Sequence, residues 1–170
     1  MIVVTVFDKD NFERFNKRES LKRRTIESDT CTPYTESYKL LFDILGIESE
    51  TVLWGLSKCR IETHKDLPFY GIDDTMLYYV VCDVSDDCFP HDYYDWSDHL
   101  FFKYMDKNET RSDLSLSFIK EYKEKGEECS HIEQVLYTYN MITNVLDDGV
   151  LLKPEDYMNL ITKYMKQEDV

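Results

Sequence analysis

The sequence contains no alanine, and its 170 residues include only five glycines and four prolines. Alanine is the best helix former, so helix energetics do not explain its absence. Alanine codons are rich in G and C, whereas lysine, tyrosine, isoleucine, aspartate and phenylalanine are abundant in this chain. The composition therefore favours an AT-rich genome, such as that of a large DNA virus, a phage or a low-GC microbe.

The few glycines do not cluster, which argues against a loop that cradles phosphate groups. The chain also lacks G-x-S-x-G, G-x-x-x-x-G-K-[ST], G-x-G-x-x-G and H-E-x-x-H, which mark common hydrolases, nucleotide-binding proteins and metalloproteases. These absences favour a protein without enzymatic activity, and we expect no cofactor.

Long apolar runs are also missing, since no segment approaches the roughly 18 apolar residues of a membrane span. The apolar run of residues 1–7 is too short for a signal peptide, has no basic region and is followed by Asp8 and Asp10. The cysteines are odd in number and form no C-x-x-C pair: Cys31, Cys59, Cys82, Cys88 and Cys129. We therefore expect reduced thiols in a cytoplasmic or nuclear protein that is not secreted.

Basic residues are too few to balance the acidic ones, and the formal net charge is -14. Nucleic-acid phosphates and anionic lipids are bound mainly through lysine and arginine, so both are disfavoured as direct partners. The charge instead favours a partner protein with a basic surface. The sequence leaves the oligomeric state open.

The length suits one globular domain, and the patterns predict an α+β fold. Residues 1–7 and 76–84 are rich in β-branched and aromatic residues, and residues 52–61 alternate, so these segments are predicted strands. Helices are predicted at residues 11–24 and 35–46, the second ending at Gly46.

The C-terminal half is predicted to contain three to four helices, because apolar residues recur at helical spacing over residues 97–105, 112–125, 132–146 and 154–166. Ser130 and Glu133 have the spacing of a capping box, Gly149 ends the third pattern, and Pro154 suits the first position of the last helix. We therefore expect a small sheet from about residues 1–90 packed against a mostly helical part from about 96–168.

The most unusual segment is DVSDDCFPHDYYDWSDH, residues 83–99, which carries six aspartates and no lysine or arginine. Aromatic side chains set among charges of one sign provide both anchoring area and electrostatic steering. The segment therefore predicts a docking surface for a protein partner. Its contact residues would be Asp86, Asp87, Phe89, Asp92, Tyr93, Tyr94, Asp95, Trp96 and Asp98. The alternative is a solvated loop whose rings lie in the core.

Metal binding is a second possibility for this segment. Zinc would use Cys82, Cys88, His91 and His99, but the spacing C-x5-C-x2-H-x7-H matches no compact zinc motif. A hard metal would use carboxylates, but the spacing of an EF-hand loop is absent. The carboxylates concerned are Asp83, Asp86, Asp87 and Asp92.

Three functions are compatible with the sequence. The leading hypothesis is a non-enzymatic intracellular binding protein, such as a viral antagonist of a host defence or signalling protein. The second is a DNA mimic, in which the aspartates replace phosphates and inhibit a nucleic-acid-binding protein. The third is a metal-dependent phosphoesterase or nuclease that uses Asp83 with Asp86, Asp87 or His91.

Overall fold

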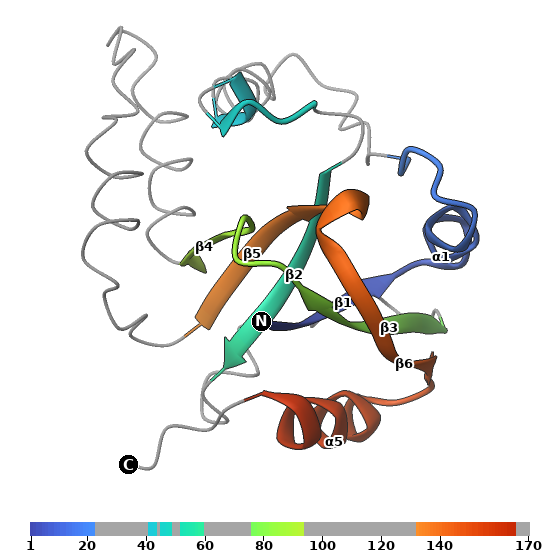
Figure 1. Cartoon of the computed structure of the whole chain (residues 1–170). Coiled ribbons are helices and arrows are strands. Elements are labelled where there is room, and N and C mark those ends of the chain that lie inside the picture. The colour runs from blue at the N-terminus through green and yellow to red at the C-terminus, as the bar shows by residue number, and fades with distance from the viewer. Residues whose placement is uncertain (23–40, 44, 49–51, 60–75, 94–131, 166–170) are drawn as a thin grey trace, which may run out of the picture.

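The computed structural model describes residues 1–22, 41–43, 45–48, 52–59, 76–93 and 132–165, and the strands within them form one antiparallel sheet (Figure 1). The strand order in the sheet is β4-β5-β2-β1-β3-β6. The strands are β1 (Ile2–Phe7), β2 (Val52–Cys59), β3 (Leu77–Val84), β4 (Phe89–Asp92), β5 (Ile132–Thr138) and β6 (Ile142–Leu151).

The sheet is strongly curled, and the connection between β3 and β4 explains why. Three strands separate β3 from β4, so in a flat sheet the two would lie about 19 Å apart, at roughly 4.8 Å per strand. Only residues 85–88 join them, a link that spans at most about 18 Å when fully extended. Because these residues also form a turn, the sheet must bend until the end of β3 approaches the start of β4.

Three sequence predictions of strands are confirmed. The β-branched run at the N-terminus forms β1, and the apolar run predicted at residues 76–84 forms β3. The alternating segment predicted from residue 52 forms β2. These three strands are neighbours in the sheet, with Val4 of β1 opposite Leu56 of β2 on one side and Val81 of β3 on the other.

Among the described residues, helices α1 (Lys9–Asn16) and α5 (Pro154–Tyr164) flank this sheet. Asp8 caps α1 by accepting a hydrogen bond from the backbone N–H of Asn11, and the chain leaves the helix through Arg18, which has a φ of 55°. The helix therefore starts two residues earlier than predicted and ends well before residue 24. Pro154 begins α5 as predicted. The carboxylate of Asp156 accepts hydrogen bonds from the backbone N–H groups of Leu152 and Lys153, the two residues that precede the helix.

The predicted helix at residues 35–46 is only partly described, and its described residues 41–43 and 45 are helical. Gly46 ends it as predicted, with a φ of 67°, and the N–H of Ile47 donates to the carbonyl of Phe42.

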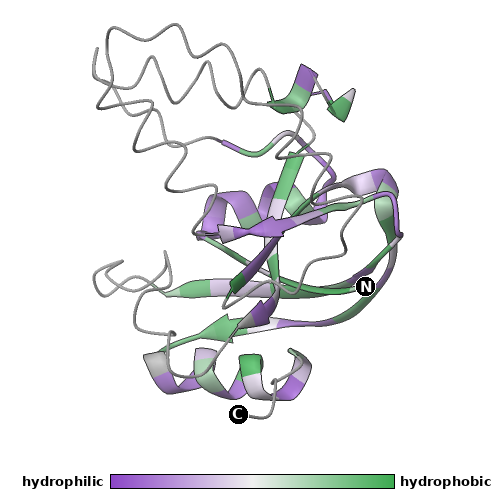
Figure 2. Cartoon of the chain, turned by 90° about the vertical axis from the view of Figure 1, so that its left-hand side faces the viewer, coloured by the Kyte–Doolittle hydropathy of each residue, from purple (hydrophilic) through white to green (hydrophobic). Residues whose placement is uncertain are grey.

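Both faces of the central strands β1, β2, β3 and β5 are largely buried, which explains why these strands are mostly apolar. One face packs with α1 around a cluster that includes Val3, Phe7, Phe15, Leu53, Val80, Val135 and Tyr137. The other face packs with α5 through Val4, Leu56, Val81, Ile132, Leu160 and Ile161. Figure 2 shows hydrophobic and hydrophilic residues alternating along α5, as expected for a helix with one face on a sheet. A third cluster joins residues 41–42 to β2, β4 and β5.

The prediction of a mostly helical C-terminal half is wrong. The residues expected to form a helix at 132–146 form strand β5, a short 3-10 turn (Tyr139–Met141) and the first half of strand β6. Glu133 is therefore not part of a helix cap, and Gly149 lies within a strand. The fold is dominated by a six-stranded antiparallel sheet. The helices predicted at residues 97–105 and 112–125 fall outside the described residues.

Within the described part of the chain, no helix is long and apolar enough to cross a membrane.

Candidate functional site

The first part of the predicted docking segment is a tight turn between β3 and β4, residues 85–88, here called the acidic turn. Asp86 and Asp87 form its tip, and both are exposed. The N–H of Cys88 donates to the carbonyl of Ser85 at 3.2 Å, which closes the turn. Two adjacent carboxylates are therefore presented to solvent on a short, closed loop.

Buried groups fix the acidic turn on both sides. Val84 precedes the turn, Cys88 is its last residue and Phe89 follows it, and all three side chains are buried. The N–H of Ser85 also donates to the carbonyl of Met141, at 2.8 Å, which ties the turn to the start of β6. Because its ends are held in the core, the turn loses little conformational freedom when it binds a partner.

Asp83 lies just before the acidic turn, at the end of β3, and is half-exposed. Its carboxylate accepts a hydrogen bond from the amino group of Met1 at 3.0 Å. The hydroxyl of Thr143 on β6 donates to the backbone carbonyl of Asp83, also at 3.0 Å. Asp83 is thus held in the sheet, whereas Asp86 and Asp87 project beyond it.

The structure places several of the predicted contact residues elsewhere. Phe89 is buried and contributes to the third apolar cluster, and Asp92 is only 4% exposed. Tyr93 is half-buried and packs against the cluster beneath α5. Tyr94, Asp95, Trp96 and Asp98 fall outside the described residues. Among the predicted contact residues that are described, the exposed ones are Asp86 and Asp87.

The described zinc candidates do not converge on one point. Cys82 and Cys88 lie in the cluster beneath α1, and burial raises the pKa of both thiols, that of Cys82 to about 12. His91 instead packs against Trp54 and Phe89, with ring centroids 5.8 Å and 5.4 Å away. No group of three metal-capable side chains exists among the described residues, and His99 lies outside them.

His91 is a core residue in a polar pair. Its Nε2 lies 3.0 Å from the side-chain oxygen of Gln134 on β5, and its Nδ1 lies 3.4 Å from the carbonyl of Phe89. Burial lowers its pKa to about 4, so the imidazole is neutral at physiological pH. A neutral and enclosed ring is suited to packing.

Sequence reasoning missed a buried polar group at one end of the sheet. Glu133 on β5 accepts a hydrogen bond from the hydroxyl of Ser57 at 2.5 Å, and Lys58 lies 3.9 Å from its other oxygen. Asp92 on β4 is directly opposite Glu133 in the strand pairing. The sequence offered no signal for this group, because its members come from three strands that are distant along the chain.

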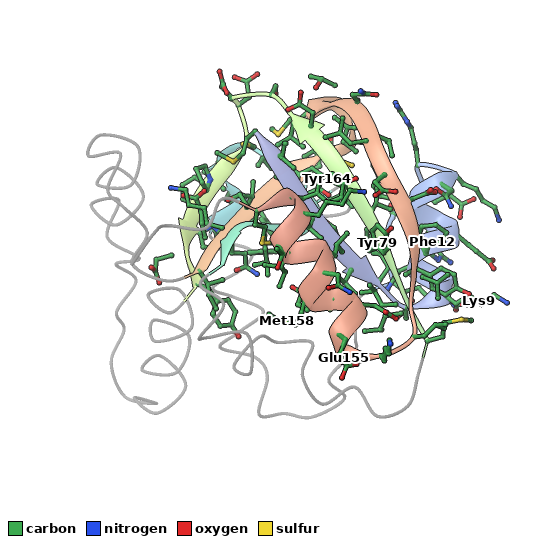
Figure 3. All side chains as sticks on the ribbon, turned by 90° about the horizontal axis from the view of Figure 1, so that it is seen from below. Lys9, Phe12, Tyr79, Glu155, Met158 and Tyr164 are labelled. Carbon is green, nitrogen blue, oxygen red and sulfur yellow. The ribbon has the colours of Figure 1, made fainter. Side chains whose placement is uncertain are left out.

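A second polar group that the sequence did not reveal joins α5 to β6. Asp147 accepts hydrogen bonds from Tyr164 at 2.5 Å and Lys163 at 3.0 Å, and these contacts lower the pKa of its carboxyl. Tyr79 of β3 packs over Gly149 of β6, where a Cβ would lie 2.9 Å from the ring. Figure 3 shows this side of the molecule, with Tyr79 and Tyr164 near β6. The group fastens the last helix to the outermost strand.

Comparison of the chain with protein families, with curated proteins and with solved structures finds no match in any of the three.

Proposed function

We propose that the chain is a binding protein that docks through the acidic turn onto a basic surface of a partner protein. The observation that carries this proposal is the exposure of Asp86 and Asp87 on a turn whose flanking residues are buried. Such a turn presents charge in a fixed geometry, which lowers the entropic cost of association.

The negative charge of the chain determines which kind of partner surface is attracted to the acidic turn. The segment from residue 71 to residue 100 contains eight aspartates and no lysine or arginine, and the whole chain carries a net charge of -14. A field of one sign steers an oppositely charged partner toward the surface and repels acidic partners. A basic protein surface is therefore the complementary partner.

The geometry favours binding over catalysis in the part of the chain that the structure describes. A phosphoesterase would bring several carboxylates or histidines toward one reacting atom. Here Asp83 contacts the Met1 amino group, Asp86 and Asp87 project into solvent, and His91 is enclosed by Trp54 and Phe89. The amino-acid composition, which is typical of an AT-rich genome, supports a viral or microbial source. A small protein from such a source could act as an antagonist of a host protein.

A pull-down with three forms of the chain tests the proposal. The first is the wild type, the second carries Asp86→Asn with Asp87→Asn, and the third carries Glu13→Gln with Glu155→Gln. Glu13 and Glu155 are exposed residues on α1 and α5, so both variants remove two negative charges. Circular dichroism and thermal melting establish that all three forms are folded.

We expect a basic partner to be retained by the wild type and the helix variant and lost from the turn variant. Equal retention by all three would contradict docking through the acidic turn. Competition by duplex DNA for the captured partner would favour the DNA-mimic alternative, because the carboxylates would then occupy a phosphate-binding surface.

A further inference from the structure

Strand β6 lies at one edge of the sheet, and its outer side is not paired with any described strand. Its inner side pairs with β3. Every residue from 142 to 150 is at least partly exposed. An edge strand of this kind presents a row of backbone N–H and C=O groups that can pair with another extended chain.

The C-terminal half of β6 is the regular part of this edge. Pairing with β3 runs without interruption from Leu151 to Asp147, opposite Leu77 to Val81. The register then shifts at two places nearer the start of β6. Such irregularities bend and twist a strand, so they limit pairing there. An incoming strand would therefore align with residues 147–151.

The side chains of this stretch combine apolar surface with one available carboxylate. Asp147 faces α5 and is engaged by Tyr164 and Lys163. Because side chains alternate along a strand, Asp148 and Val150 share the opposite face. Both are exposed, and Asp148 forms no ion pair with any residue in the described ranges. Leu146, at the irregular end, is also exposed.

The negative charge at the edge of β6 favours a cationic segment over a second copy of the chain. A second copy of the chain would bring the same two aspartates, Asp147 and Asp148, to the shared edge, and each copy has a net charge of -14. Like charges directly opposite each other on neighbouring strands are destabilising, whereas a cationic residue opposite Asp148 is attractive. Self-association through this edge is therefore disfavoured.

We propose that the 147–151 edge of β6 binds an extended segment of a partner protein, with lysine or arginine opposite Asp148 and an apolar residue opposite Val150. Backbone hydrogen bonds supply the affinity in this mode, and the two side-chain positions supply the preference. This site is separate from the acidic turn, which lies beyond the opposite end of β3. It therefore does not depend on the function proposed for the turn.

Peptide binding measured by fluorescence polarisation tests this site. The probe is a fluorescein-labelled peptide of about seven residues. Every second residue is threonine, and the positions between are occupied by lysine and valine in turn. A second peptide has glutamate in place of lysine, and a third has the lysine sequence with N-methyl groups on every internal amide. The proteins are the wild type, Asp148→Lys, Asp148→Asn and the turn variant with Asp86→Asn and Asp87→Asn.

We expect the wild type and the turn variant to prefer the lysine peptide over the glutamate peptide by about five- to tenfold. Asp148→Lys should reverse this preference, and Asp148→Asn should abolish it. The N-methylated peptide should not bind, because it cannot complete the backbone pairing. Amide chemical-shift changes should map to β6 and β3.

Three results would overturn the site. They are equal binding of the N-methylated peptide, a peptide preference that is the same in wild type and Asp148→Lys, and no binding of the lysine peptide at about 1 mM, the weak end of specific affinities. Because Asp148→Asn makes a minimal change at an exposed position, it keeps the test decisive if Asp148→Lys is poorly folded.

Discussion

The hydroxyl groups of Thr5 on β1 and Tyr137 on β5 lie 2.6 Å apart in the buried interior, although β2 runs between their strands. Gly55 of β2 makes this contact possible. A Cβ at that position would lie 2.3 Å from Cγ1 of Val3 and 2.5 Å from Oγ1 of Thr5. The missing side chain thus lets two polar groups meet across a strand that separates them.

Gly55→Ala should therefore destabilise the fold by about 3 kcal/mol, because the added methyl group overlaps two stiff β-branched side chains. The measurement is chemical denaturation, with the free energy of unfolding compared to wild type. Alanine at the exposed residue Asn144 is the matched control and should have an effect below about 0.5 kcal/mol. A Gly55→Ala protein as stable as wild type would show that the strands are not packed this closely.

The hydrogen bond itself can be measured by a double-mutant cycle. Tyr137→Phe should cost about 1–2 kcal/mol, because it leaves the buried Thr5 hydroxyl without this partner. Thr5→Val should cost a similar amount, while the double variant should cost less than the sum of the two. Additive costs would mean that the two hydroxyls do not interact.

The stability of the fold should depend on pH through His91. Burial lowers its folded-state pKa to about 4, from the 6.5 of an exposed histidine. The unfolded chain therefore binds the proton more tightly, so stability is complete above about pH 6.5 and falls as the pH drops toward 4. The loss amounts to about 3 kcal/mol, at about 1.4 kcal/mol per pKa unit.

His91→Phe provides the comparison for this pH effect, because phenylalanine keeps an aromatic ring beside Trp54 and does not titrate. Denaturation midpoints between pH 4 and 7 should fall more steeply for wild type than for the variant. The carboxyl groups titrate in both proteins, so the difference between the two slopes isolates the histidine. Parallel slopes would contradict a buried, neutral imidazole.

The tie between α5 and β6 should weaken when Asp147 loses its charge. Asp147→Asn keeps the shape of the side chain but weakens its contacts with Tyr164 and Lys163, at a cost of about 1 kcal/mol because the site is partly exposed. Hydrogen exchange should become faster in α5 and β6 while that in β1 stays unchanged. An equal increase in the exchange rate in all strands would show that the contacts of Asp147 do not stabilise α5 and β6 locally.

The sequence correctly predicted the elements that are determined by residues close together in the chain. β1 is a run of mostly β-branched residues and β3 a nearly continuous apolar run, Gly46 ends a helical segment at positive φ, and Pro154 opens α5. Strand β5 was misread because both of its faces are buried, so its apolar residues do not alternate and their spacing imitates that of a helix. Its pairing with β2 and β4 decides the outcome, and neither partner is near it in sequence.

The same limit applies to the candidate site. The sequence identified the acidic segment, and Asp86 and Asp87 are exposed there. It could not show that Phe89 and Asp92 are buried, because their burial follows from the pairing of β4 with β5, some forty residues later in the chain. Glu133 was read as part of a local cap, whereas its partner is Ser57 on another strand.

The acidic turn is proposed to bind a basic protein surface, and this claim is decided by the affinity of the captured partner for three forms of the chain. Isothermal titration calorimetry would compare wild type, the Asp86→Asn with Asp87→Asn variant, and the Glu13→Gln with Glu155→Gln variant. We predict that the turn variant binds about tenfold more weakly and with a smaller salt dependence, while the helix variant binds as wild type does. Equal affinity of all three forms would contradict the claim.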